Sequence, residues 1–207
     1  MKRIQTVTYF GYSGFTKTDA LYRETYDVAK LIAAEGVSIV NGGFGGVMEA
    51  VSHGARDAGA HVIGVTFYPK EATHFEKTTN ANPWIDEEII TDNYLTRTLK
   101  LIELGDIYII FNGGTGTISE FAMVWGLARI YYGKHKPLIL YGSFWKNIID
   151  TFNKNMFLRP EELEVFTIVN NADEAVDALK KYDNEIYIRH LNGNVNIVTP
   201  EDASNIE

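Results

Sequence analysis

Two glycine-rich segments carry residue types that could hold a phosphate. They are residues 41–49 (NGGFGGVME) and residues 112–120 (NGGTGTISE), and each follows a β-branched run and opens a segment of helical period. Glycines there let the backbone approach a ligand closely, and the free N–H groups of a helix's first turn point at an anion. The candidate binding residues are Gly43, Gly45, Gly46 and Met48 in the first segment and Gly113, Gly114, Thr115, Gly116 and Thr117 in the second.

Neither segment is a known nucleotide fingerprint. A dinucleotide-binding G-x-G-x-x-G would need glycine where Met48 and Ser119 stand, and the Gly-Lys-Ser/Thr of a Walker loop is absent. Tight turns of a Rossmann-like sheet explain the same glycines without any ligand. Two such turns at neighbouring strands favour the ligand site, because both would face the crevice where open α/β sheets bind ligands.

Arg97 and Glu120 are the candidate catalytic residues. Glu120 lies in the first turns of the helix after the second segment, where the helix dipole alone favours a carboxylate by ~0.3–1 kcal/mol. Arg97 lies in the first turn of its own helix, where that dipole disfavours a cation, and it heads an apolar stripe with Leu101 and Leu104. An arginine in this place indicates a head group held at the crevice, although one snorkelling over the stripe or paired with Asp92 fits the same spacing.

The elements that position these residues follow an alternating pattern. Short β-branched runs alternate with longer helical segments, which is typical of βαβ units around a parallel sheet. We expect strands at 6–10, 38–41, 61–66, 107–111, 137–141 and 166–169, and helices at 19–34, 47–58, 94–104, 117–131, 144–155 and 172–181. Residues 68–92 lack clear periodicity, so we expect a functional loop or flap there.

The predicted fold is α/β, a Rossmann-like, doubly wound, mainly parallel sheet with helices on both faces. Residues 1–184 form this nucleotide-binding domain. Residues 185–191 and 194–199 flank Asn192-Gly193, a dipeptide suited to a type I′ turn, so residues 185–200 are expected to form a C-terminal β-hairpin extension. Residues 201–207 are a polar tail, expected to be frayed.

Composition limits the chemistry. The 207 residues carry a net charge of −8 and no cysteine, so disulfides, thiolate nucleophiles and zinc ribbons are excluded. The five histidines have no metal-like spacing, and we expect neither a metal nor a cofactor. No apolar run is long enough to span a membrane and no secretory core is present, so we expect a cytoplasmic protein. The acidic balance argues against nucleic-acid polymers and anionic membranes as partners.

The same residues resemble a known family. Residues 42–48, Arg97 and residues 112–120 resemble the LOG ("Lonely guy") family, whose members are often mislabelled lysine decarboxylases. The hallmark of that family is P-G-G-x-G-T-x-x-E with an upstream arginine. The spacing from Arg97 to Gly113, the position of Asp106 and the segment 144–160 also match, and the resemblance covers roughly residues 6–182.

The resemblance implies a Rossmann-like phosphoribohydrolase that cleaves the N-glycosidic bond of a nucleoside 5′-monophosphate, AMP or a cytokinin derivative. It implies that Arg97 and Glu120 are the catalytic pair and that the second segment holds the phosphate. It also implies a homodimer or larger assembly, consistent with a helix at 121–131 that is apolar on most faces. A non-catalytic carrier of nucleotide or molybdenum cofactor, from the same superfamily, is the alternative.

The chain departs from the hallmark in several places. Asn112 replaces the proline, Leu95 and Thr96 replace His-Glu, and Thr98 stands where a basic residue usually follows the arginine. A family glutamate that helps to bind substrate has two candidates here, Glu71 and Glu76, both in the long loop. The glycine segments contain no lysine, which disfavours the Schiff-base chemistry of a decarboxylase.

Overall fold

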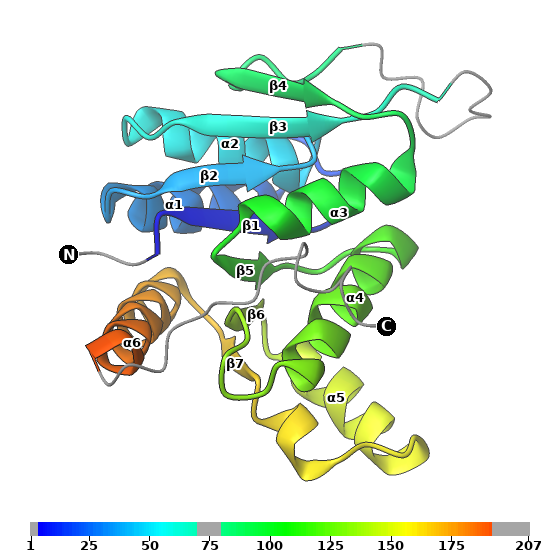
Figure 1. The fold of residues 1–207 in the computed structure, drawn as a ribbon. Helices are drawn as coiled ribbons and strands as arrows, with labels where there is room; N and C mark the ends of the chain where they lie inside the picture. The colour runs from blue at the N-terminus through cyan, green and yellow to red at the C-terminus, as the bar shows by residue number, and fades with distance from the viewer. Residues whose placement is uncertain (1–3, 70–79, 192–207) are drawn as a thin grey trace.

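In the part of the chain that the structure describes, the fold is built on one sheet of seven parallel strands. A computed structural model of the chain describes residues 4–69 and 80–191. The strand order is β4-β3-β2-β1-β5-β6-β7, so the sequence runs outward in one direction from β1 and then in the other from β5 (Figure 1). The strands are β1 (Thr6–Phe10), β2 (Ser38–Asn41), β3 (Val62–Thr66), β4 (Glu87–Ile90), β5 (Ile107–Ile110), β6 (Leu138–Tyr141) and β7 (Phe166–Val169).

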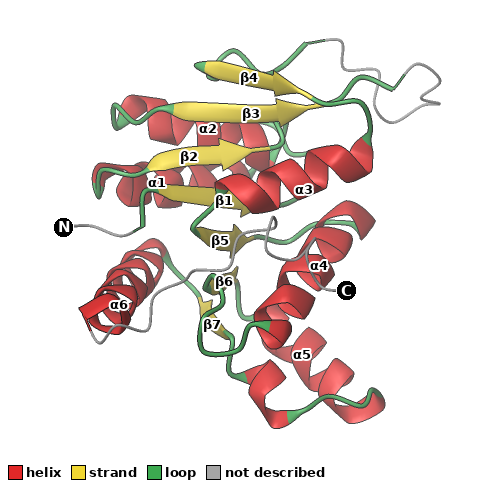
Figure 2. Cartoon of the chain, viewed as in Figure 1, coloured by secondary structure: helices red, strands yellow, loops and turns green. Residues whose placement is uncertain are grey.

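Helices cover both faces of the sheet (Figure 2). One hydrophobic cluster joins the sheet to α1 (Ala20–Ala34), α2 (Val47–Asp57) and α6 (Ala172–Leu191). A second cluster joins the opposite face to α3 (Tyr94–Leu104), α4 (Thr115–Ile130) and α5 (Phe144–Asn155), with the short 3₁₀ helix η1 (Pro160–Leu163) beside α4. The predicted doubly wound α/β fold is therefore confirmed.

The central strands are buried on both faces, which explains their β-branched composition. In β1, Val7 and Tyr9 enter the first cluster and Phe10 enters the second, because successive side chains of a strand point to opposite faces. The two clusters hold β1 and β5 in the middle of the sheet, and the carboxyl ends of these strands position the residues described below.

The predicted loop at 68–92 contains a strand that the pattern does not reveal. Residues Glu87–Ile90 form β4, which pairs in parallel with β3 at the edge of the sheet. Three of its four residues are exposed, so this segment shows neither an apolar run nor a clean alternation. The six predicted strands are present, each with ends within one residue of the prediction.

The predicted C-terminal hairpin is wrong in its first arm. Helix α6 runs on to Leu191, so residues 185–191 are helical rather than extended. Leu179, Tyr182 and Ile186 are buried against the first cluster, and their spacing of three and four residues continues the helical stripe past the predicted end. The second arm, the Asn192-Gly193 turn and the tail lie outside the described residues.

Candidate active site

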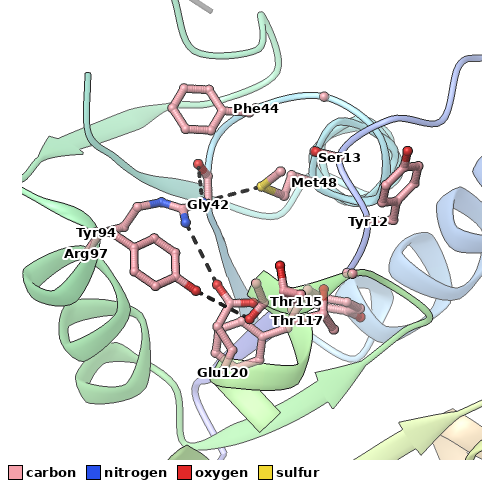
Figure 3. A pocket seen from close by; sticks show the side chains of 16 residues that line it. Tyr12, Ser13, Gly42, Phe44, Met48, Tyr94, Arg97, Thr115, Thr117 and Glu120 are labelled. Carbon is pink, nitrogen blue, oxygen red and sulfur yellow. Dashed lines mark hydrogen bonds and ion pairs between the residues drawn. The ribbon is translucent and has the colours of Figure 1, made fainter. Parts of the chain in front are cut away.

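A pocket of about 420 Å³ opens where the strand order reverses, at the carboxyl ends of β1 and its neighbours. Such a point is where open α/β sheets bind ligands. Four segments line it: the loop after β1, the turn after β2, the first turn of α3, and the turn and helix start after β5. Figure 3 shows Tyr94 and Arg97 reaching in from α3, and Thr115, Thr117 and Glu120 lying together on α4.

Residues 112–117 follow β5, and we call them the second glycine turn. This turn leaves the start of α4 open to the pocket. Gly114 is the N-cap residue, and no side chain bonds to this cap. Gly114, Thr115, Gly116 and Thr117 line the pocket, so the positive end of the α4 dipole faces it. This arrangement is an anion site of the kind that holds a phosphate.

Helix α3, by contrast, is closed by its own side chains. The Asn93 Oδ1 atom accepts hydrogen bonds from the backbone N–H groups of Leu95 (2.9 Å) and Thr96 (3.0 Å). The Thr96 hydroxyl reciprocates by accepting from the Asn93 N–H at 3.2 Å, which completes a capping box. The start of α3 therefore leaves fewer N–H groups for a ligand than the start of α4.

Residues 41–46 follow β2, and we call them the first glycine turn. Much of this turn packs against other parts of the protein instead of facing the pocket. Gly43 and Gly46 have φ of +79° and +64°. The Val47 N–H, in the first turn of α2, donates to the Tyr12 carbonyl at 2.8 Å, so the loop after β1 already occupies that helix start. Gly45 and Met48 line the pocket, whereas Gly43 and Gly46 do not.

Arg97 is anchored by backbone carbonyls. Its Nε donates to the Val65 carbonyl at 2.8 Å and its Nη2 donates to the Gly42 carbonyl at 2.9 Å. Its guanidinium carbon lies 5.5 Å from the centroid of the Phe44 ring, within cation–π range. The residue is only 6% exposed, so it does not snorkel to solvent as the alternative for this position would require.

Glu120 faces Arg97 across the pocket (Figure 3). The Arg97 Nη1 and Glu120 Oε1 atoms are 3.8 Å apart, and Glu120 is only 7% exposed. Burial raises the pKa of Glu120 to about 7, although the charge of Arg97 acts in the opposite direction. A carboxyl with such a pKa exchanges its proton near neutral pH, as a general base or acid requires.

The structure gathers most of the predicted site residues in this one pocket. Those that line it are Arg97, Glu120, Gly45, Met48, Gly114, Thr115, Gly116 and Thr117. Gly43, Gly46 and Gly113 lie in the turns without lining it. Glu71 and Glu76 lie outside the described residues.

Sequence reasoning missed several residues that line the pocket, among them Tyr12, Ser13 and Tyr94. Tyr12 and Ser13 come from the loop after β1, and Tyr94 is the first residue of α3. The loop after the first strand of a doubly wound sheet is where ligands bind, and this rule could have identified Tyr12 and Ser13. Nothing in the local sequence of Tyr94 sets it apart, because its position depends on how α3 packs beside α4.

The described residues hold neither a metal cluster nor a membrane span. Within residues 4–69 and 80–191, no group of three or more histidine, aspartate and glutamate residues could bind a metal ion. In the same part of the chain, no helix is long and apolar enough to cross a membrane.

Comparisons with known proteins agree with this fold. The model of the SLOG cluster4 family matches residues 4–173. A cytokinin riboside 5′-monophosphate phosphoribohydrolase from Mycobacterium tuberculosis is 31% identical over 163 residues, which cover 73% of this chain and 81% of that protein.

Solved structures of similar fold include cofactor-binding proteins. The molybdenum cofactor binding protein of Rippkaea orientalis superposes with a TM-score of 0.65 and 25% identity, over 87% of this chain and 98% of that one. The molybdenum cofactor carrier protein of Chlamydomonas reinhardtii superposes with a TM-score of 0.62 over 86% of this chain and 98% of that one; at 19% identity this likeness shows the fold alone. From the family match and the mycobacterial relative, the chain belongs to the SLOG cluster4 family and is a member of the LOG family.

Proposed function

We propose that the protein hydrolyses the N-glycosidic bond of a nucleoside 5′-monophosphate and releases the free base and ribose 5-phosphate. The observation that carries the proposal is the buried pair of Arg97 and Glu120 beside the open start of α4 in one pocket. The activity named for the mycobacterial relative supports it.

The phosphate sets the position of the sugar. Bound to the first turn of α4, it would meet the backbone N–H groups of Thr115, Gly116 and Thr117 and the Thr117 hydroxyl. Glu120 stands three residues after Thr117, ~4.5 Å further along the helix axis. A ribose joined to that phosphate therefore reaches the carboxyl group.

Glu120 supplies the chemistry on the sugar. As the base leaves, positive charge develops on the ribose, and a nearby carboxylate stabilises this oxocarbenium character. A water oxygen bonds to C1′, its proton passes to Glu120, and the electron pair of the broken C1′–N bond leaves with the base, which then takes up a proton as Glu120 returns to its carboxylate form. Arg97 holds either the ribose hydroxyls or the carboxylate in place through charge-assisted hydrogen bonds.

The remaining walls of the pocket fit a flat base. Phe44 and Met48 come from the first glycine turn and the start of α2, and Tyr12 lies in the loop after β1 (Figure 3). These side chains offer apolar and aromatic surface, which suits stacking of a heterocycle. We therefore place the base between the loop after β1 and the first glycine turn.

Product analysis tests the reaction. Purified protein is incubated with a panel of nucleoside 5′-monophosphates, and base and ribose 5-phosphate are measured by chromatography. We expect equal amounts of both products from at least one monophosphate and much slower release from the matching nucleoside, which lacks the phosphate. No release from any monophosphate would overturn the proposal.

The carrier function is a second candidate because the Rippkaea orientalis protein shares the fold at 25% identity over most of both chains. A pterin-bearing cofactor also presents a phosphate that the start of α4 could receive. Titration with the cofactor and with AMP separates the two functions. Tight cofactor binding without AMP turnover would favour the carrier.

A homodimer or larger assembly through α4 is also proposed. An apolar hollow of about 260 Å³ lies between α4 and the end of α5, lined by Ile118, Trp125 and Met156 among others, and Phe157 beside it is fully exposed. Contiguous apolar surface of this kind marks an interaction site. Light scattering at micromolar concentration tests the assembly, and a monomeric mass would contradict it. The cytoplasmic location expected from the sequence stays a prediction.

A further inference from the structure

Tyr94 and Ser119 join the two helices that carry the catalytic pair. Tyr94 opens α3 three residues before Arg97, and Ser119 directly precedes Glu120 on α4. Their hydroxyl oxygens lie 2.6 Å apart. The contact therefore ties α3 to α4 beside the facing ends of Arg97 and Glu120.

The hydrogen bonds at this contact join both hydroxyls to one backbone carbonyl. The Ser119 hydroxyl lies 2.8 Å from the Gly116 carbonyl oxygen. Each hydroxyl has a single proton, so one of the two donates to this carbonyl and the other donates to its partner hydroxyl. Tyr94 Oη also lies 3.4 Å from the Gly116 carbonyl, so the contact ends on the turn of α4 that lines the pocket.

Neighbouring residues fix the position of Tyr94 at the start of α3. The Asn93 capping box fixes the start of α3, and the Thr98 hydroxyl donates to the Tyr94 carbonyl at 3.0 Å. The Tyr94 ring packs edge-on against Phe67, with centroids 6.1 Å apart. Its hydroxyl is therefore presented to α4 from an ordered helix end.

The separation of the catalytic pair depends on how α3 and α4 lie relative to each other. Arg97 is tied through Nε and Nη2 to the carbonyls of Val65 and Gly42, which belong to β3 and the first glycine turn. Glu120 sits on a different helix, and its 3.8 Å separation from Arg97 Nη1 is longer than a hydrogen bond. A small shift of α4 would change this separation together with the position of the phosphate turn.

We propose that Tyr94 is a positioning residue whose hydrogen bond to Ser119 sets the separation of Arg97 and Glu120 and holds the first turn of α4 against the pocket. The inference rests on the proposed function for its kinetic consequence. Its structural consequence, the relative placement of two side chains, does not depend on which reaction the pocket performs.

Removal of either hydroxyl tests the inference. Y94F keeps the ring and S119A keeps the helix, so both are expected to fold, with melting temperatures within a few degrees of the wild type. We expect each to lower kcat for the nucleoside monophosphate about tenfold, because misplaced catalytic groups affect the chemical step, and to raise KM as well, because the phosphate turn moves with α4. S119T retains a hydroxyl and is expected to restore kcat.

A double variant shows whether the two hydroxyls act together. Y94F/S119A is expected to be about tenfold slower than the wild type, like either single variant, and not a hundredfold slower. Y26F is the matched control, because the Tyr26 hydroxyl bonds to Asp57 on α2, away from the pocket. It should leave kcat unchanged.

Crystal structures of the variants separate failure of this inference from failure of the proposed function. If the wild type turns over no monophosphate, the proposed function fails. The inference is then tested by the Arg97–Glu120 separation alone. We expect this separation to increase in Y94F and S119A and to return to the wild-type value in S119T. An unchanged separation in both single variants would overturn the inference, and so would multiplying kinetic losses in the double variant.

Discussion

Both Asn-Gly-Gly turns follow a buried strand and open a helix, at residues 41–43 and 112–114. In the first turn, Asn41 is fully buried; its Oδ1 accepts from the Gly43 N–H at 2.8 Å and its Nδ2 donates to the Ser52 hydroxyl at 2.9 Å. In the second turn, Asn112 and Gly114 are exposed, and a Cβ built on Gly114 meets nothing within 4 Å. The asparagine is thus bonded inward in the first turn and exposed in the second, and the last glycine of the three lines the pocket only in the second turn.

This difference assigns separate roles to the two turns. The first glycine turn is a frame: its Gly42 carbonyl holds Arg97, and its last residues pack against the backbone of the loop after β1. The second glycine turn leaves room and N–H groups at the pocket. Glycines in similar contexts therefore serve internal packing in one case and ligand access in the other.

The largest expected effect is on stability, from Gly46→Ala in the frame. Gly46 has φ +64° and ψ −128°, a region that only glycine adopts readily, and a Cβ would overlap with the backbone of Tyr12 and Ser13. We expect the free energy of unfolding to fall by about 3 kcal/mol in urea titrations. Gly36→Ala is the control, because Gly36 has φ +77° with nothing within 4 Å of its Cβ. An equal loss in both variants would show that packing against the loop contributes nothing.

The second effect is on activity, from Gly42→Ala. A Cβ here would overlap with Arg97 Nη2 and Met48 Sδ, which are side-chain rather than backbone atoms, so the guanidinium must leave its present hydrogen bonds while the fold survives. We expect kcat/KM to fall ~10²-fold, as when one charge-stabilising donor is lost. The loss should not add to that of R97K in a double variant. Wild-type kcat/KM in Gly42→Ala would refute a framing role for this glycine.

The third effect is the pH dependence of stability that Glu120 causes. Burial raises the folded-state pKa of this carboxyl from an ordinary value of 4.5 to about 7, so the folded protein binds the proton more tightly than the unfolded chain does. The contribution of Glu120 to the free energy of unfolding is therefore present at low pH and lost as pH rises through 7. Relative to E120Q, the wild type should gain about 2 kcal/mol of unfolding free energy between pH 8 and pH 5.5. A constant difference between the two proteins would contradict the raised pKa.

The smallest effect is on binding, from Gly114→Ala in the open turn. Gly114 has φ −93°, which alanine adopts freely, so we expect an unfolding free energy within ~0.5 kcal/mol of the wild type. The added methyl group occupies space at the phosphate site, and KM for the nucleoside monophosphate should rise about tenfold with kcat unchanged. An unchanged KM would mean that the ligand does not approach this glycine.

Sequence patterns predicted the parts of the fold that are buried and periodic. The β-branched runs predicted the six strands other than β4, and these strands lie within the sheet or against its helices. Edge strand β4 was missed because its first two residues, Glu87 and Glu88, are exposed and charged and leave no apolar signal. The hairpin prediction followed the Asn192-Gly193 turn signal and overlooked that Ile186 continues the apolar stripe of α6.

The site residues that belong to a single sequence motif could be predicted. The second glycine turn and Glu120 share a nine-residue segment, and Arg97 heads an apolar stripe, so their types and places could be read from the sequence. Tyr12 and Ser13 reach the pocket only because β1 lies beside β5, and Tyr94 reaches it only because α3 packs beside α4. Gly43 and Gly46 were assigned to binding because their packing, against Thr66 of β3 and against the loop after β1 respectively, has no sequence signature.

The central claim is that Glu120 drives base release from a nucleoside 5′-monophosphate. The most direct test compares the rate of base release by the wild type and by E120Q, at pH 8 and saturating substrate. We expect E120Q to be ~10³-fold slower while it still binds ribose 5-phosphate, because the phosphate turn is unchanged. Release by E120Q at the wild-type rate would contradict the claim.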